Sequence, residues 1–201
     1  MSRARSLSDD VVLERAAAVF WRRGYAGASL RDLTRATGLS AAALYHRYAD
    51  KNGLFVETLR RYADRGLNER IARHTAAPSP IEAIRGFFSE LVAISAADPD
   101  RRGCLLVNTA LDGAATSEAA RALVRDRLGE IEAFFAAQLR RAVAAGAIDP
   151  TIEVDTAAAG LLGATLGIRV MARLDPDPAR LNRLAERGLA SLQPPDRRSQ
   201  T

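Results

Sequence analysis

The chain has 201 residues, with 29 Lys and Arg, 24 Asp and Glu, a single Cys and two His. Its 26% charged and 48% hydrophobic residues are the balance of a globular protein, which excludes wholesale disorder. One cysteine excludes a disulfide framework and a multi-cysteine zinc site, and we expect neither a metal nor another cofactor. The first ten residues lack the apolar core of a signal peptide, so the sequence predicts a cytoplasmic protein.

The net charge of +5 is unevenly distributed along the chain. Residues 1–51 carry nine basic and five acidic groups, whereas the remaining 150 residues are close to neutral. A basic region of this kind indicates a part that binds a polyanion, although a solvated basic surface fits the charge alone equally well. Arg3 and Arg5 form a basic arm that can reach a DNA minor groove, but we favour a solvated arm.

Apolar residues recur with helical periodicity along the chain, and no segment shows sustained period-two alternation. The sequence therefore predicts an all-α protein. Only the apolar run 104–111 fits a strand as well as a helix, because so short a run has no decisive period. The expected helices are 9–23, 29–37, 41–48, 51–74, 81–96, 104–111, 117–145, 154–174 and 178–192.

Polar residues and glycines delimit the second and third of these helices. Ser29, followed three residues later by Asp32, approximates a capping box, with Asp in place of the usual Glu. Gly38 ends that helix with the positive φ that a sharp turn needs, and Ser40 caps the next one. Two short helices joined in this way are typical of a helix-turn-helix, whose second helix enters the DNA major groove. Such turns also occur in enzymes, so the spacing alone leaves that alternative open.

The apolar stretch 154–174 raises the question of a membrane span. We expect none, because the run is too short and is interrupted by charged residues, Asp155, Arg169 and Arg173. The stretch also has small residues at three- and four-residue spacing, Gly160, Gly163 and Gly167. Small residues let two helices approach closely, which predicts a buried interface within the chain or between two chains.

The segment 16–59 resembles the DNA-binding region of the TetR family of bacterial transcriptional repressors. It reads AAAVFWRRGYAGASLRDLTRATGLSAAALYHRYADKNGLFVETL. The resemblance is specific for about the first 60 residues, and the rest matches in length and helical pattern. It implies an all-helical homodimer, with a three-helix helix-turn-helix DNA-binding head at 1–50. A larger helical domain at 51–201 is then expected to bind a ligand and to dimerise.

The resemblance also implies which residues contact the DNA backbone. Lys51, at the start of the fourth helix, and Tyr45, at the exposed end of the third, match residues that bind phosphate in the family. Ser29 adds another phosphate contact if its hydroxyl and its amide are free. Such contacts position a protein on DNA and carry no sequence information. Core packing is the alternative for Tyr45, and we favour it for Tyr48.

Base reading is expected from the second and third helices. Arg31 lies where some relatives contact a base, and an arginine suits the two acceptors of guanine. Ala41 and Ala42 offer contact only with thymine methyl groups. His46 can reach a base edge, with solvent exposure as an equal alternative. Arg47 stands where the family commonly has His and can still bind phosphate.

A regulator of this kind is switched by a ligand that binds two arrangements of the heads unequally. We expect an unidentified small molecule to bind within the second domain. The candidates are aromatic residues and polar residues inside apolar runs, namely Tyr62, Phe88, Cys104, Asn108, Phe135, Thr165 and Arg169. Each polar group needs a partner if buried, and a backbone carbonyl or a carboxylate can serve as well as a ligand.

Cys104 supplies an alternative switch. It follows two arginines, which favour a thiolate and thus an oxidant or electrophile sensor. The commoner state of a free cysteine is a buried small hydrophobe. The alternative function is therefore a DNA-binding regulator without a small-molecule ligand, switched by modification of Cys104 or by a protein partner. We expect no enzyme, because the sequence has no Gly-rich phosphate loop, no G-x-S-x-G elbow and no His pair at metal spacing.

The last two helices predict the mode of self-association. The segments at about 154–174 and 178–192 present small and apolar faces, the second of them rich in leucine. Paired with the same helices of a second chain, they form a four-helix bundle with two-fold symmetry. A symmetric dimer of this kind is expected to bind a near-palindromic operator in double-stranded DNA.

Overall fold

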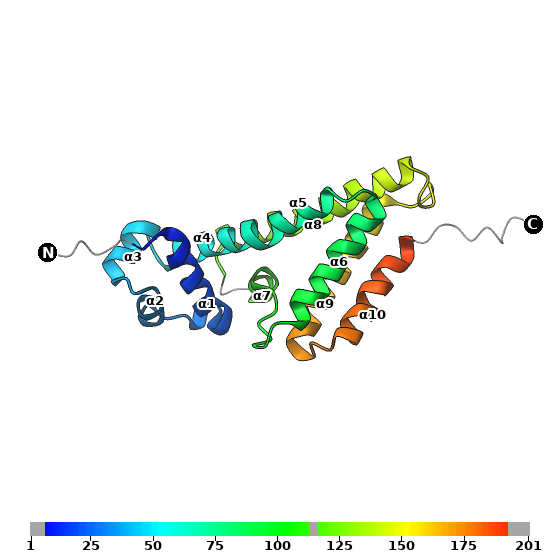
Figure 1. The fold of residues 1–201 in the computed structure, drawn as a ribbon. Helices are drawn as coiled ribbons and strands as arrows, with labels where there is room; N and C mark the ends of the chain where they lie inside the picture. Colours follow the sequence, from blue (N-terminus) through cyan, green and yellow to red (C-terminus); the bar gives the residue numbers. More distant parts are fainter. Residues whose placement is uncertain (1–6, 113–115, 193–201) are drawn as a thin grey trace, which may run out of the picture. The chain divides into compact units, whose positions relative to one another are not determined.

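The computed structural model describes residues 7–112 and 116–192, and within these ranges it contains helices and no strand. The all-α prediction is therefore confirmed, and 104–111 is helical rather than extended (Figure 1). Arg3 and Arg5 lie outside the described residues. The helices are α1 (Asp9–Gly27), α2 (Leu30–Thr37), α3 (Ala41–Tyr48), α4 (Lys51–Ala63), α5 (Glu69–Thr75), α6 (Pro80–Ala96), α7 (Leu105–Leu111), α8 (Glu118–Ala144), α9 (Val154–Leu174) and α10 (Pro178–Leu189).

The predicted helix boundaries around α2 and α3 are confirmed in atomic detail. The Ser29 hydroxyl accepts a hydrogen bond from the amide of Asp32, and the Asp32 carboxylate accepts one from the amide of Ser29. Gly38 ends α2 with φ 74°, and the Ser40 hydroxyl accepts from the amide of Ala43 at 3.2 Å. Both helices are short, and an isolated two-turn helix is unstable in water. The caps stabilise them by providing acceptors for backbone amides that have no partner within the helix.

Two expected helices deviate from regular geometry. Helix α1 leaves helical geometry at Gly24, where φ is 66°, and a short helical segment follows the kink as far as Gly27. The expected continuous helix over 51–74 is wrong in detail, because a π-helical turn, Asp64–Asn68, separates α4 from α5. The hydrophobic pattern does not distinguish such a turn from an α-helix, because the turn differs only in its backbone hydrogen bonds, which span five residues instead of four.

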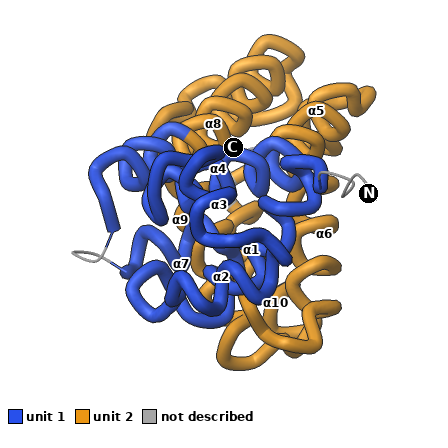
Figure 2. Tube along the Cα trace, turned by 90° about the vertical axis from the view of Figure 1, so that its left-hand side faces the viewer, with its two compact units in different colours: residues 1–67, 104–126 blue, residues 68–103, 127–201 orange. Residues whose placement is uncertain are grey.

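The chain forms two compact units (Figure 2). Unit 1 comprises 1–67 and 104–126, and unit 2 comprises 68–103 and 127–201. The helix-turn-helix therefore shares a unit with α7 and the beginning of α8, which are distant from it in sequence. The boundary predicted at residue 50, between DNA-binding and ligand-binding domains, stays a prediction about function.

Each unit has an aromatic core. In unit 1, Phe20 of α1 packs against Phe55 of α4 with ring centroids 4.8 Å apart. In unit 2, α6 and α8 contribute a cluster of four phenylalanines, all at most 5% exposed: Phe87, Phe88, Phe134 and Phe135. Burying a large apolar side chain stabilises a fold by about 1.5–3 kcal/mol, so these clusters hold the helices on which the polar residues are displayed.

Helix α9 meets the length and composition of a membrane span, contrary to the expectation that its charges exclude one. Its most apolar window has a mean hydropathy of 1.3, yet only 28% of that window is buried within the chain. One such helix is weak evidence for a membrane span, because a helix that packs on other helices has the same composition. Its unburied apolar surface bears on self-association.

Candidate nucleic-acid interface

Helix α3 presents a narrow surface to the outside. Leu44 is fully buried and anchors the helix, whereas Ala42 and His46, four residues apart on one face, are exposed. Ala41 and Tyr45 are half-buried beside that face. Four of the five residues predicted to contact DNA on this helix therefore lie at or next to its exposed side, as a helix that enters a groove requires.

The end of α3 is held by the beginning of α1. The Arg47 guanidinium donates to the carbonyl oxygen of Leu7 at 3.0 Å and lies 3.4 Å from the Asp9 carboxylate. The Tyr48 hydroxyl donates to the same carboxylate at 2.9 Å. Partial burial and this hydrogen bond raise the pKa of Tyr48 to about 12. Tyr48 thus packs as expected, while Arg47 would have to exchange these contacts to bind a phosphate.

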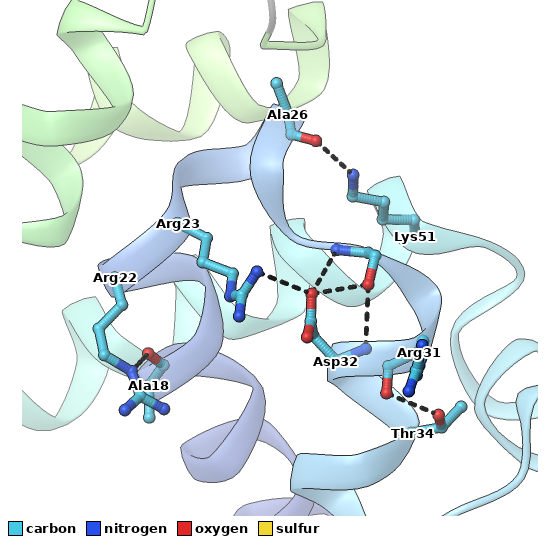
Figure 3. Close-up of polar contacts among 9 residues, drawn as sticks. Ala18, Arg22, Arg23, Ala26, Arg31, Asp32, Thr34 and Lys51 are labelled. Atoms are coloured by element: carbon cyan, nitrogen blue, oxygen red, sulfur yellow. Dashed lines mark hydrogen bonds and ion pairs between the residues drawn. The ribbon is translucent and has the colours of Figure 1, made fainter.

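Ser29 does not meet the condition set for a phosphate contact. Its hydroxyl donates to the Asp32 carboxylate at 2.6 Å and its amide donates to the same oxygen at 3.3 Å (Figure 3). The hydroxyl hydrogen bond is the main cause that lowers the pKa of Asp32, helped by the nearby Arg23 guanidinium. The physical reason is the capping box itself, which uses both donors of Ser29 that a phosphate would need.

Lys51 is fixed against the end of α1. Its ammonium lies 4.6 Å from the centroid of the Tyr25 ring. It also donates to the carbonyl oxygen of Ala26 at 3.5 Å, as Figure 3 shows. Burial lowers the pKa of Lys51, because a partly desolvated ammonium has lost some of its hydration. The contact with Tyr25 orients the charge without neutralising it, which leaves it able to attract an anion.

Arg31 differs from Ser29, Arg47 and Lys51 in that its side-chain donors have no partner among the described residues. Its side chain is exposed, and among the described residues its guanidinium has no hydrogen bond or ion pair. Only its carbonyl oxygen is used, as acceptor from the Thr34 hydroxyl at 3.0 Å. A free planar guanidinium retains its five donors for a base or a phosphate.

The turn between α3 and α4 is unusually tight. Ala49 has φ 64° and ψ −53°, and the amide of Asp50 donates to the carbonyl oxygen of Tyr48 at 2.8 Å. This three-residue γ-turn is a strained conformation for a residue with a Cβ. The Asp50 carboxylate then caps α4 by accepting from the amide of Gly53 at 2.7 Å. The turn thereby places Lys51, the first residue of α4, close to the end of α3.

The predicted ligand residues fall into two groups. In unit 1, the Tyr62 hydroxyl donates to the Cys104 sulfur at 3.7 Å, and Asn108 lies one helical turn further along α7. Cys104 is 9% exposed, so the buried state is the one observed. Phe88, Phe135, Thr165 and Arg169 belong to unit 2.

In unit 2 the polar candidates have protein partners. The Phe88 and Phe135 rings stack with centroids 5.6 Å apart. The Thr165 hydroxyl donates to the carbonyl oxygen of Leu161 at 3.0 Å, and the Arg169 guanidinium donates to the Ser95 hydroxyl at 3.1 Å. Ligand binding by either group stays a prediction.

Sequence reasoning missed two residues that shape the interface. Asp9 holds α3, and Tyr25 lies beneath the Lys51 ammonium. The sequence shows Asp9 only as part of a first helical turn, and its partners are about 40 positions away in the chain. Tyr25 carries a signal, because it directly follows Gly24 in the segment that resembles the TetR family, but its contact with Lys51 requires the fold.

Comparison with known proteins gives matches in both parts of the chain. Residues 12–58 match the model of the bacterial regulatory proteins of the tetR family, and residues 80–187 match that of the tetracyclin repressor-like C-terminal domain. The chain is 35% identical over 114 residues to the HTH-type transcriptional regulator YezE of Bacillus subtilis, covering 56% of this chain and 58% of YezE. It is 32% identical over 107 residues to the repressor ComR of Escherichia coli, covering 53% and 51%. The chain thus spans about half the length of these curated relatives.

Solved structures extend the likeness over nearly the whole chain. A cysteine mutant of the TetR family regulator CifR, complexed with 26-base-pair operator DNA, is 34% identical with a TM-score of 0.85, covering 94% of this chain and 99% of that one. A TetR regulator from Chloroflexus aurantiacus is 25% identical with a TM-score of 0.80, covering 90% and 93%. Since a family model spans more than half of the chain, and a capped helix-turn-helix precedes it, this chain belongs to the TetR family of bacterial transcriptional regulators.

Proposed function

We propose that this protein is a ligand-responsive transcriptional repressor that binds a near-palindromic operator as a homodimer and is released by a small molecule. The observation that carries the DNA-binding part is the Lys51 ammonium, oriented by Tyr25 at the N-terminus of α4, immediately after the exposed face of α3. Arg31, exposed and without an ion pair among the described residues, adds a donor for a base. CifR, similar over nearly its whole length, was solved on operator DNA.

The first prediction concerns the phosphate contact of Lys51. A random-sequence selection followed by footprinting supplies the operator, and fluorescence anisotropy at several salt concentrations measures binding. Lys51→Ala should weaken binding to all duplexes and lower the salt slope by about 0.9 for each phosphate that the variant no longer binds. Arg31→Ala should instead relax preference at one operator position.

Arg85→Ala is the matched control, because Arg85 is exposed on α6 and has no ion pair among the described residues. It removes the same charge outside the helix-turn-helix and should leave the slope almost unchanged. If neither Lys51→Ala nor Tyr45→Phe changed the affinity for the operator, the phosphate contacts assigned to these two residues would be wrong.

The dimer is supported by the surface of α9. Gly160 and Gly163 are exposed with no atom near enough to contact a Cβ, and Leu174 is 68% exposed. Helix α10 packs closely on α9, because a Cβ at Gly188 would lie 2.8 Å from that of Ala164. The same two helices from a second chain would bury this small and apolar surface in a four-helix bundle.

The inducer is tested by thermal unfolding against a panel of metabolites and xenobiotics. A ligand at 100 times its Kd should stabilise the folded protein by about 2.7 kcal/mol. A true inducer must also release the operator, since only unequal affinity for two states can shift them. If a thiol reagent releases the operator from the parent protein but not from Cys104→Ser, and no panel compound does so, modification of Cys104 is the switch instead.

A further inference from the structure

Helices α1 and α2 enclose a groove of about 520 Å³ in unit 1. Its walls come from these two helices alone, with Val19 and Ala36 as the apolar part of the lining. The polar lining is three arginines and one aspartate: Arg22, Arg23, Arg35 and Asp32. None of these arginines is among the residues that the helix-turn-helix assignment uses, so the groove is an additional concentration of positive charge in unit 1.

The single carboxylate of the groove is already occupied. Asp32 accepts from the hydroxyl and amide of Ser29, and the Arg23 guanidinium lies 3.3 Å from it. Arg23 therefore has a structural partner. The groove retains an excess of positive charge, because Asp32 balances only one of its three arginines.

The other two arginines keep donors for a ligand. The Arg22 Nε donates to the carbonyl oxygen of Ala18 at 3.2 Å, which leaves its two terminal nitrogens (Figure 3). Arg35 is exposed and has no hydrogen bond or ion pair within the part of the chain that the structure describes. A guanidinium with free terminal nitrogens can donate two parallel hydrogen bonds to two oxygens of one phosphate. Arginine therefore matches a phosphate in geometry as well as in charge.

We propose that this three-arginine groove binds backbone phosphates of duplex DNA that flank those reached by Lys51. The inference rests on the proposed function, and it extends the DNA footprint beyond the helix-turn-helix contacts. The groove is continuous with the candidate interface, because Asp32 belongs both to its wall and to the cap of α2. Figure 3 shows Lys51 on one side of Asp32 and Arg22 with Arg23 on the other.

The repeating charge of DNA fits this arrangement. Phosphates recur along each strand about every 3.4 Å of helix axis, so cations on both sides of the α2 N-terminus can meet neighbouring phosphates of one strand. A contact of this kind positions the protein and reads no base. It follows that the groove should raise the affinity for every sequence equally, and only on duplexes that reach beyond the palindromic core.

The test uses the full-length protein with Arg22→Gln and Arg35→Gln, singly and together. Arg23 is left in place because it pairs with Asp32. Arg85→Gln is the control for removal of an exposed arginine elsewhere. Binding is measured by anisotropy against salt on two duplexes: the selected operator trimmed to its core, and the same core extended by about one helical turn, roughly ten base pairs, at each end. Thermal melting checks that the variants remain folded.

On the extended duplex, the salt slope of the double variant should fall by about 0.9 for each phosphate that it no longer binds, which is about fivefold in affinity per phosphate at 0.15 M salt. On the trimmed duplex it should match the parent protein. Equal reductions of the salt slope on both duplexes would show that the groove proposal is wrong. An unchanged slope on the extended duplex would also contradict it and would fit an acidic protein partner instead. If either of these results is obtained while Lys51→Ala still weakens binding, the groove proposal is wrong and the proposed function stands. If the parent protein binds neither duplex, both fall.

Discussion

At the scale of single residues, the head is organised by carboxylates that bind within the protein. Asp9 accepts from Tyr48 and pairs with Arg47, while Asp10 pairs with Arg61 at 2.8 Å and Arg65 at 2.6 Å. The first turn of α1 thus holds α3 with one carboxylate and α4 with the next. The helix N-terminus additionally favours both negative charges.

The capping box around Ser29 illustrates how a correct local prediction limits a functional one. The spacing of Ser29 and Asp32 predicts a reciprocal cap, and the cap forms. The same hydrogen bonds occupy the hydroxyl and the amide that the family resemblance assigns to a phosphate. Local sequence therefore determines the helix start, and the full set of hydrogen bonds decides which donors remain.

Gly53 gives a prediction at this scale. A Cβ at Gly53 would overlap the carbonyl oxygen of Tyr48, which belongs to backbone and cannot swing aside. Gly53→Ala should therefore open the turn after α3 and lower the free energy of unfolding by about 1–3 kcal/mol, as overpacking does. Urea denaturation followed by circular dichroism measures this change.

The control is Gly129→Ala, inside α8. Gly129 lies on the helix surface and a Cβ there would meet no atom within 4 Å, so alanine should stabilise the helix by about 0.5–1 kcal/mol. If both variants had a lower free energy of unfolding, any methyl group added to a helix would be destabilising. The clash with the Tyr48 carbonyl would then not be the cause of the Gly53→Ala effect.

At the scale of elements, α5 and α6 are joined by one carboxylate. Glu90 of α6 accepts from Arg70 at 3.1 Å, Arg73 at 2.7 Å and His74 at 2.8 Å, all on α5. Partial burial of Glu90 would raise its pKa, but these hydrogen bonds outweigh burial and lower the pKa to about 2. Three donors within about one turn of α5 thus hold this short helix to α6.

Glu90→Gln should lower the free energy of unfolding by about 2–3 kcal/mol at pH 7, because one pKa unit corresponds to about 1.4 kcal/mol. The folded-state pKa lies below the unfolded value, so the stabilisation is complete above pH about 4.5 and is lost as the pH falls towards 2. Urea denaturation of both proteins at pH 7 and at stepwise lower pH measures the difference, which should shrink with acidification.

Glu82→Gln serves as the comparison, since Glu82 is exposed in the first turn of the same helix. It should cost less than about 1 kcal/mol, the usual range for a charge at a helix terminus. A Glu90→Gln effect that is equally large at every pH would exclude the carboxylate charge as its cause and point to packing.

At the scale of the whole molecule, helix α9 points to self-association, because a single chain does not bury its apolar surface. Helix α9 is apolar enough to be a core helix, yet most of its apolar window is unburied. An exposed apolar surface of this kind typically marks an interface. In the proposed dimer it is buried by its own copy, and the dimer in turn gives the two heads a fixed spacing on DNA.

Gly163→Arg tests this interface. Gly163 is surrounded by open space within the chain, so a long charged side chain fits the monomer but would be desolvated in a bundle. Multi-angle light scattering should show a monomer for this variant and a dimer for the parent protein and for Ala72→Arg, an exposed site on α5. A Gly163→Arg dimer as stable as the parent would place the interface elsewhere.

The sequence by itself determined the helical class, the caps of α2 and α3, and the family, because periodicity, capping and a contiguous motif are local properties of the chain. Only the tertiary structure decided what the charges do. Arg47 turns to Asp9 and Lys51 lies over Tyr25, while Arg22 joins Arg35 in one groove. The positive charge of residues 1–51 is visible in the sequence, but a charge acts through its distance to other charges. Those distances join residues that are far apart in the chain, and only folding sets them.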